Sequence, residues 1–283
     1  MKILQYLFDR KVKFVYYYLR SMRPYYGIVA GTTTLYGCLL SRHTLEESRT
    51  WLLFLMGFFF WGFNQIFLDR WGRHEGVIDA AHCPVGAREL RPALVFAVSL
   101  IGLMVIAAIG FVLSPWTLVF LGACGILNIV YSFLKCVPVI NCLVFACAMT
   151  CCALFGYVGS LGELLKFDEV LSFLAIWVLP VHFLMCHNSY FKDVEGDRVA
   201  GVRTLQTICP PFAFAVSILG MWMYWLVYLS GTILIPKYVP ILLIVLALII
   251  FFFDALVRKQ YQRMTKRNCQ FCVALLNFPF FFG

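Results

Sequence analysis

Two aspartates spaced four residues apart, Asp193 and Asp197, come soon after one of the most apolar runs of the chain, residues 173–185. This spacing puts both carboxylates on one face of a helix, where they repel each other unless a cation lies between them. Carboxylate oxygens around an open position suit Mg²⁺, which keeps waters and is completed by substrate phosphates. Cations that would hold a diphosphate directly lie in the same stretch, at Lys192, Arg198 and Arg203. The pattern predicts a magnesium site for a phosphorylated substrate; the alternative is a solvated helix end whose charges only mark the edge of the apolar run.

The elements that carry these residues are predicted to be membrane-spanning helices. Of all residues 62% are hydrophobic and 13% are charged, whereas roughly a quarter are charged in soluble domains. Apolar runs of about 17 to 25 residues are long enough to cross a hydrocarbon core. Nine such runs are expected to begin near Pro24, Trp51, Pro92, Pro115, Pro138, Val170, Pro211, Tyr238 and Cys269. We therefore expect an all-α, polytopic membrane protein of about nine transmembrane helices.

The first 23 residues differ from the rest because they are basic and aromatic and lack a small-residue cleavage site. They are predicted to form an amphipathic helix that lies on the membrane before the first span. Residues 24–283 are then expected to form one transmembrane domain.

Lys and Arg residues are distributed unequally over the predicted loops. If the N-terminus is cytoplasmic, nineteen of them fall on that side and four on the other. This bias predicts a multi-pass protein whose N-terminus and polar loops face the cytoplasm. Nucleic-acid binding is not expected, because the basic residues are scattered over short loops beside lipid and do not form one patch.

The polar stretch KDVEGDRVAGVRTL, residues 192–205, resembles the second aspartate-rich motif of the UbiA superfamily of intramembrane prenyltransferases, which is close to KDxxGDxxxGxxTL. The matching residues are Lys192, Asp193, Gly196, Asp197, Gly201, Thr204 and Leu205. Two weaker likenesses occur in the same order as in the family. Arg23 and Pro24 resemble the RP that opens the first span, and Tyr131 and Lys135 resemble the Tyr and Lys after the fourth. The resemblance implies a helical bundle with a pocket on the cytoplasmic side.

The first aspartate-rich motif departs from the family pattern, which resembles NDxxDxxxDxxNxPxRPL. Its gap-free placement covers residues 68–85 and keeps Asp69 and Pro84, but Gly72 and Gly76 stand at two metal-binding aspartate positions. An insertion relative to the family would restore a more regular alignment. The acids that would replace the missing carboxylates are Asp69, Glu75 and Asp79. Among them we favour Asp69, because it is kept in register.

The candidate site residues fall into three groups. The expected Mg²⁺ ligands are Asp193, Asp197, Asp69, Glu75 and Asp79. The expected substrate-binding residues are Lys192, Arg198, Arg203, Asn188, Arg23, Asn64 and His187. The expected catalytic residues are Lys135, Tyr131 and Asp69.

The resemblance implies transfer of a prenyl chain from a polyprenyl diphosphate to a lipophilic acceptor, an aromatic or quinone precursor. A membrane terpene cyclase of UbiA type is an alternative, because the altered first motif leaves room for a cation that closes on itself. A third alternative is a transporter or non-catalytic scaffold in which the acidic pair only caps a helix.

Overall fold

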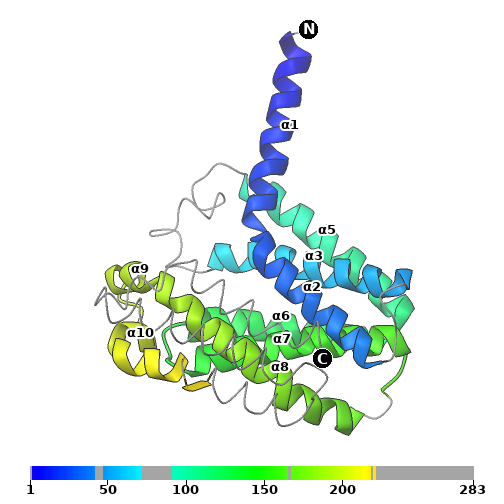
Figure 1. Cartoon of the computed structure of the whole chain (residues 1–283). Coiled ribbons are helices and arrows are strands. Elements are labelled where there is room, and N and C mark those ends of the chain that lie inside the picture. The colour runs from blue at the N-terminus through cyan, green and yellow to red at the C-terminus, as the bar shows by residue number, and fades with distance from the viewer. Residues whose placement is uncertain (1, 42–46, 72–90, 165–166, 218, 221–283) are drawn as a thin grey trace, which may run out of the picture. The chain divides into compact units, whose positions relative to one another are not determined.

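The computed structural model describes residues 2–41, 47–71, 91–164, 167–217 and 219–220, and within these ranges the chain forms helices and no strand. The helices are α1 (Lys2–Ser21), α2 (Pro24–Leu40), α3 (Ser48–Trp71), α5 (Pro92–Leu113), α6 (Trp116–Leu134), α7 (Ile140–Leu161), α8 (Phe167–Ser189), the 3₁₀ turn η1 (Tyr190–Lys192), α9 (Val194–Val199) and α10 (Leu205–Ile208) (Figure 1). This confirms the all-α prediction. The predicted spans that begin near Tyr238 and Cys269 lie outside the described residues, so the count of nine stays a prediction.

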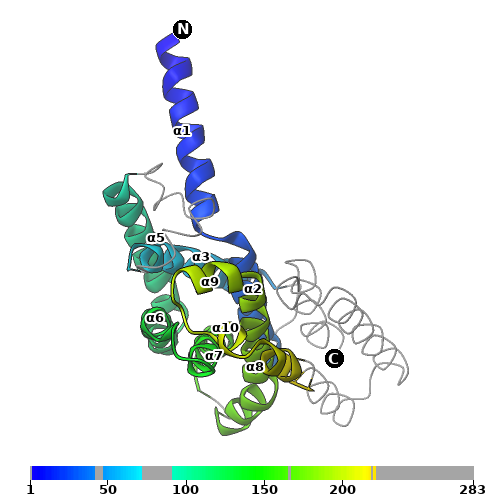
Figure 2. The same cartoon turned by 90° about the vertical axis from the view of Figure 1, so that its left-hand side faces the viewer.

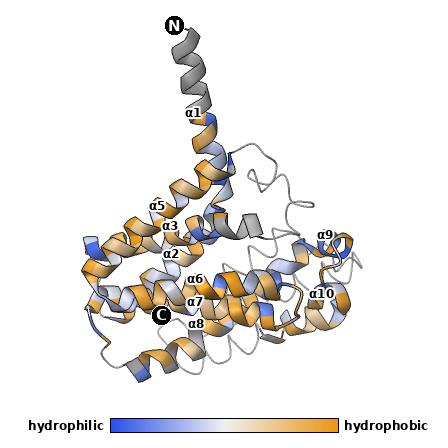
Figure 3. Cartoon of the chain, turned by 180° about the vertical axis from the view of Figure 1, so that it is seen from behind, coloured by the Kyte–Doolittle hydropathy of each residue, from blue (hydrophilic) through white to orange (hydrophobic). Residues whose placement is uncertain are grey.

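Three of the described helices are long and apolar enough to cross a membrane, namely Ala93–Leu113, Trp116–Leu134 and Ile140–Leu161. Apolar residues cover most of α5 and α6 (Figure 3). Large apolar side chains on these helices are also exposed, for example Val112 at 84% and Ile126 at 63%. Contiguous apolar surface of this kind is unfavourable in water. The chain is therefore an integral membrane protein.

The chain packs as two compact units, which are described separately. The first unit contains residues 1–133 and 147–174, and the second contains residues 134–146 and 175–283. The candidate site residues are distributed over both units.

In the first unit, glycines allow α2 and α7 to approach closely. A Cβ atom added at Gly37 would meet the backbone carbonyl of Ala153, and one added at Gly156 would meet the carbonyl of Thr34. The thiol of Cys38 also donates a hydrogen bond to the Gly156 carbonyl, with 3.5 Å between sulfur and oxygen. Helices in lipid associate through close packing of small residues. These glycines therefore fix α2, the helix that begins directly after Arg23.

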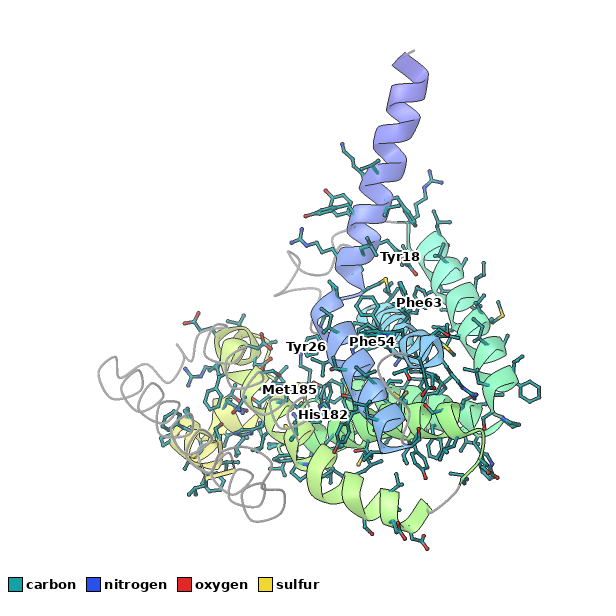
Figure 4. All side chains as sticks on the ribbon, turned by 45° about the vertical axis from the view of Figure 1, so that its right-hand side comes forward. Tyr18, Tyr26, Phe54, Phe63, His182 and Met185 are labelled. Atoms are coloured by element: carbon teal, nitrogen blue, oxygen red, sulfur yellow. The ribbon has the colours of Figure 1, made fainter. Side chains whose placement is uncertain are left out.

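The C-terminal part of α1 is attached to the same unit. Tyr18 and Met22 are buried in a cluster with Ile66 of α3 and Val95 of α5. Figure 4 shows Tyr18 on α1 near Phe63 of α3, which packs against this cluster. In both Figure 1 and Figure 2 the N-terminal part of α1 extends away from α2, α3 and α5.

The helices that lead into the two aspartate motifs end differently. Helix α3 continues past its apolar part as far as Trp71. Helix α8 ends at Ser189, where the chain tightens into η1 before α9 begins. The Ser189 hydroxyl donates to the Cys186 carbonyl at 2.7 Å, and such a bond competes with the regular helical pattern. The second aspartate motif is thus carried by its own short helix.

Candidate active site

The two aspartates of the second motif are held by one turn of helix. The backbone N–H of Asp197 donates to the Asp193 carbonyl at 2.8 Å, which is the i to i+4 bond that the spacing predicts. Asp197 is buried, with 5% of its surface exposed, while Asp193 is half-buried. A buried carboxylate is unfavourable unless positive charge or hydrogen bonds compensate it. Positive charge from a bound cation at this turn would compensate the buried carboxylate.

Gly201 is the glycine that closes the end of α9. It has φ +69°, in the left-handed region, which glycine adopts without the steric penalty of a Cβ atom. The Gly201 N–H donates to the Arg198 carbonyl at 3.2 Å, and the Val202 N–H donates to the Asp197 carbonyl at 2.8 Å. This pair of bonds is a Schellman motif, which closes the end of a helix. The buried aspartate and the glycine four residues later are thus parts of one local structure.

Thr204 begins the next helix, α10. Its side chain is fully buried, and its backbone N–H donates to the Thr207 hydroxyl at 2.9 Å in a capping box. Capping of this kind satisfies backbone donors that have no partner within the helix. The threonine of the motif therefore has a structural function in turning the chain.

A buried amide that we did not predict, Gln206, connects α10 to the end of α8. Its Nε2 donates to the His187 carbonyl at 2.7 Å and lies 3.1 Å from His187 Nδ1. The other ring nitrogen of His187, Nε2, is 2.8 Å from the Ala213 carbonyl. Because a carbonyl can only accept, Nε2 carries the proton and Nδ1 accepts from Gln206. Both ring nitrogens of His187 are thus engaged within the protein, while its predicted contact with substrate remains a prediction.

Asn188, the residue after His187, is fully buried. Its Oδ1 accepts a hydrogen bond from the Ser217 hydroxyl at 2.5 Å. Its Nδ2 makes no hydrogen bond with any described residue. A buried donor without an acceptor costs about 1–3 kcal/mol, so this amide is suited to donate to a bound ligand.

Two cationic residues of the motif, Arg198 and Arg203, differ from the two aspartates because they face outward. Arg198 and Arg203 are both exposed. Lys192 lies in η1, with its side chain outside the described residues. The two guanidinium groups are therefore accessible to an anionic substrate.

Gln206 and Ser217 carried only weak signals in the sequence. Gln206 follows the motif directly and lies among apolar residues, where a buried amide must find hydrogen-bond partners. Ser217 lies in an apolar run and belongs to no motif. Their partners, His187 and Asn188, are distant in sequence, so the pairs emerge only when the chain folds.

Two other predicted substrate-binding residues lie in the first unit. Arg23 has φ +49° and ψ +66°, a left-handed conformation directly before Pro24. The proline disfavours the right-handed helical conformation for the residue before it, so the chain turns here from α1 into α2. Asn64 of α3 is 7% exposed, and its Nδ2 has no hydrogen-bond acceptor among the described residues.

The structure describes the side chains of two of the three predicted catalytic residues. Tyr131 is half-buried on α6. Lys135 follows that helix, is also half-buried, and accepts a hydrogen bond at its carbonyl from Asn141 Nδ2 at 3.2 Å. Asp69 lies in the last turns of α3, with its side chain outside the described residues.

The donor set of the second motif fits Mg²⁺. Within the described ranges no group of three or more His, Cys, Asp or Glu side chains could hold a metal ion, so Asp193 and Asp197 would be a partial ligand set. Mg²⁺ is commonly bound by one or two carboxylates, with waters and substrate phosphates completing its shell. The predicted ligands Glu75 and Asp79 lie outside the described residues.

Solved structures of known proteins share this fold. A UbiA homologue from Aeropyrum pernix K1 has a TM-score of 0.70 at 16% identity, over 90% of this chain and 96% of that one. A digeranylgeranylglyceryl phosphate synthase has a TM-score of 0.63 at 16% identity, over 94% and 96% of the two chains. A UbiA homologue from Archaeoglobus fulgidus, bound to DMAPP and Mg²⁺, has a TM-score of 0.61 at 17% identity, over 93% and 97%.

No curated protein matches the sequence. The UbiA prenyltransferase family matches residues 30–278, which is most of the chain and includes both aspartate motifs. The chain belongs to the UbiA prenyltransferase family.

Proposed function

We propose that this protein transfers a prenyl group from a polyprenyl diphosphate to a lipophilic acceptor within the membrane, in a reaction that depends on Mg²⁺. The observation that carries the proposal is the helical turn that joins Asp193 to the buried Asp197, with Arg198 and Arg203 exposed beside it. The Archaeoglobus fulgidus homologue was solved with DMAPP and Mg²⁺, and also with GPP and Mg²⁺. These ligands support a prenyl diphosphate as the donor.

The proposed chemistry is ionisation of an allylic diphosphate. Asp193 and Asp197 would hold Mg²⁺, which when bound neutralises the charge that develops on the leaving diphosphate. The side chains of Lys192, Arg198 and Arg203 would donate charge-assisted hydrogen bonds to phosphate oxygens. The prenyl tail would lie among apolar side chains of the bundle.

Other residues are proposed to orient the substrates. The Nδ2 groups of Asn188 and Asn64 would each donate to a substrate oxygen, since each is buried without an acceptor among the described residues. Arg23 would contact the diphosphate. Tyr131 and Lys135 are the proposed catalytic residues on and after α6.

A second metal site is proposed at the first aspartate motif. Asp69 is the favoured ligand, with Glu75 and Asp79 as the other candidates. Alanine variants of these three acids, compared by the Mg²⁺ concentration that gives half-maximal rate, would identify the ligand. Replacing the acid that binds the second metal is expected to raise this Mg²⁺ concentration.

The acceptor is proposed to be an aromatic or quinone precursor. One observation favours a second function, terpene cyclisation. Gly72 and Gly76 stand where the family has metal-binding aspartates, and an altered first site would change how the allylic cation is held before it reacts.

Incubation of the purified protein with Mg²⁺ and farnesyl or geranylgeranyl diphosphate separates the candidate functions. Diphosphate release that requires an added acceptor supports transfer. Release without acceptor, accompanied by a cyclic hydrocarbon, supports cyclisation. No release with any donor or acceptor contradicts both and supports a scaffold or transporter. The product profile with a panel of donors and acceptors would then identify the substrates.

A further inference from the structure

Helix α1 has one face that is packed against the protein. Tyr18 of α1 and Met22, directly after the helix, are buried there, and Phe14 packs against the same cluster. The hydroxyl oxygens of Tyr18 and Ser99 are 2.9 Å apart. Since Ser99 donates its only proton to the Val95 carbonyl, Tyr18 must donate to Ser99. Burial raises the pKa of Tyr18, although the hydrogen bond to Ser99 opposes the shift, so the phenol keeps the proton that it donates.

A second face of α1 is apolar but exposed. Val12, Val15, Tyr16 and Leu19 are 50%, 54%, 59% and 49% exposed. Their positions, i, i+3, i+4 and i+7, form a continuous stripe along a helix. We call these four residues the outer stripe. Because the packed face already attaches α1 to the protein, the outer stripe is available to an apolar medium outside it.

The charges of the N-terminal segment indicate what that medium is. Residues 1–23 contain six Lys and Arg residues and one acid, Asp9. Lys13, which lies within the span of the outer stripe, is exposed. A helix with an apolar face and basic residues beside it suits the boundary between lipid headgroups and acyl chains, and its positive charge suits anionic headgroups.

The direction of α1 agrees with such a location. In both Figure 1 and Figure 2, α1 runs across the direction of α6, and α6 is long and apolar enough to span a membrane. A helix that crosses the direction of a membrane span lies along the membrane surface.

We propose that the outer stripe of α1 is a binding surface for an anionic lipid leaflet. Val12, Val15, Tyr16 and Leu19 would enter the level where headgroups meet acyl chains, and Lys13 would contact lipid phosphates. This surface is separate from the proposed catalytic site, and its test does not depend on prenyl transfer.

Photocrosslinking of the full chain tests the apolar contact. The variant Tyr16→p-benzoylphenylalanine places a crosslinker in the outer stripe, and Phe14→p-benzoylphenylalanine places one on the packed face as a matched control. Both are reconstituted in nanodiscs of phosphatidylcholine and phosphatidylglycerol, and elution as a monodisperse species verifies folding. Mass spectrometry should find phospholipid adducts at position 16 at least ten-fold more often than at position 14. Equal adduct yields at the two positions would overturn the proposal.

The charge contribution is tested in the same nanodiscs with Lys13→Glu and Lys13→Arg, each combined with the crosslinker at position 16. Adducts of the parent protein should contain more phosphatidylglycerol than the bulk lipid does. Because one basic residue near an anionic surface contributes about 1 kcal/mol, or about five-fold in partition, Lys13→Glu should lower this enrichment several-fold. Lys13→Arg should preserve it. Adducts that follow the bulk composition in the parent protein would contradict recognition of anionic lipid.

Discussion

At the scale of single residues, three acids of the second motif differ in exposure although they are close in sequence. Asp197 is buried, Asp193 is half-buried and Glu195 between them is exposed on the same short helix. A metal ligand must face the site, whereas a solvated acid need not. Glu195 is therefore a control for the loss of negative charge in this segment.

Asp197→Ala is expected to lower the rate of diphosphate release on the order of 100-fold or more, because charge on the leaving group is then poorly stabilised. Glu195→Ala should change the rate less than about two-fold, as surface substitutions usually have small effects. Steady-state assays over a range of Mg²⁺ concentrations measure both variants. A near-normal rate for Asp197→Ala, in a protein that elutes as the parent does, would remove this residue from the metal site.

Gly201→Ala isolates the cost of backbone conformation. A Cβ atom at Gly201 meets nothing within 4 Å, but its left-handed φ should cost about 1–2 kcal/mol for alanine. Gly122→Ala is the matched control, since a Cβ there also meets nothing within 4 Å and the residue lies inside α6. Apparent melting temperatures in detergent should fall for Gly201→Ala and stay equal or rise for Gly122→Ala. Equal melting temperatures for the two variants would contradict the argument.

The identity of the motif residues could be read from the sequence, and so could the one-turn spacing of the aspartates. Their supporting partners could not. The bonds of Gln206 to His187 and of Ser217 to Asn188 join residues 19 and 29 positions apart. No local pattern encodes such pairs, because each depends on how α10 and the helical residues 210–217 fold back on α8.

At the scale of elements, the contact between Gln206 and His187 fastens α10 to the end of α8. The segment that carries both aspartates, which includes α9, lies between His187 and Gln206 in the chain. We infer that this contact positions that segment.

Gln206→Met keeps the length of the side chain but removes its donors, so the His187 carbonyl and Nδ1 lose their partner. The expected cost is about 1–3 kcal/mol of stability, together with a weaker apparent affinity for Mg²⁺. A double-mutant cycle with His187→Ala, measured by thermal unfolding, should be clearly non-additive. Additive effects would show that the two side chains do not act together.

The close approach of α2 and α7 gives a second prediction for elements. Gly156→Ala should destabilise the protein by about 1–3 kcal/mol through overpacking, because the added Cβ meets the Thr34 backbone, which cannot rotate away. At Gly125 the nearest atom to an added Cβ is Phe60 Cζ at 4.0 Å, so Gly125→Ala should be neutral or slightly stabilising. Thermal unfolding of both variants measures the difference, and a larger loss at Gly125 would refute the packing argument.

Hydropathy located the described helices well, since their starts lie within three residues of the predicted positions at Trp51, Pro138 and Val170. Pro24 and Pro92 are the first residues of α2 and α5, where the sequence predicted these spans to begin. The break at Ser189 escaped prediction because it arises from a side-chain bond to the backbone and not from a proline or glycine.

At the scale of the whole molecule, composition was sufficient to predict an all-α membrane protein. The chain has few charged residues, and its apolar residues form runs long enough to cross a membrane as helices. The finer details depend on the first aspartate motif and the last predicted spans. Those segments lie outside the described residues, and their single-sequence patterns are weaker than that of the second motif.

The orientation in the membrane is testable at α7, whose 22 residues span about 33 Å at about 1.5 Å per residue. The charge distribution predicts that Cys136, before α7, faces the cytoplasm and that Glu163, after it, faces the opposite side. An epitope inserted after either residue of the full chain should be accessible to antibody from opposite sides of sealed vesicles. Accessibility of the Glu163 epitope from the cytoplasmic side would reverse the predicted orientation.

The left-handed backbone conformation of Arg23 has a free-energy cost that glycine would avoid. Glycine would adopt the same left-handed geometry freely, whereas arginine there costs about 1–2 kcal/mol. A chain shaped by folding alone would favour glycine at the junction between the first two helices. Contacts of the guanidinium would offset this cost, by holding its neighbours or by engaging a ligand.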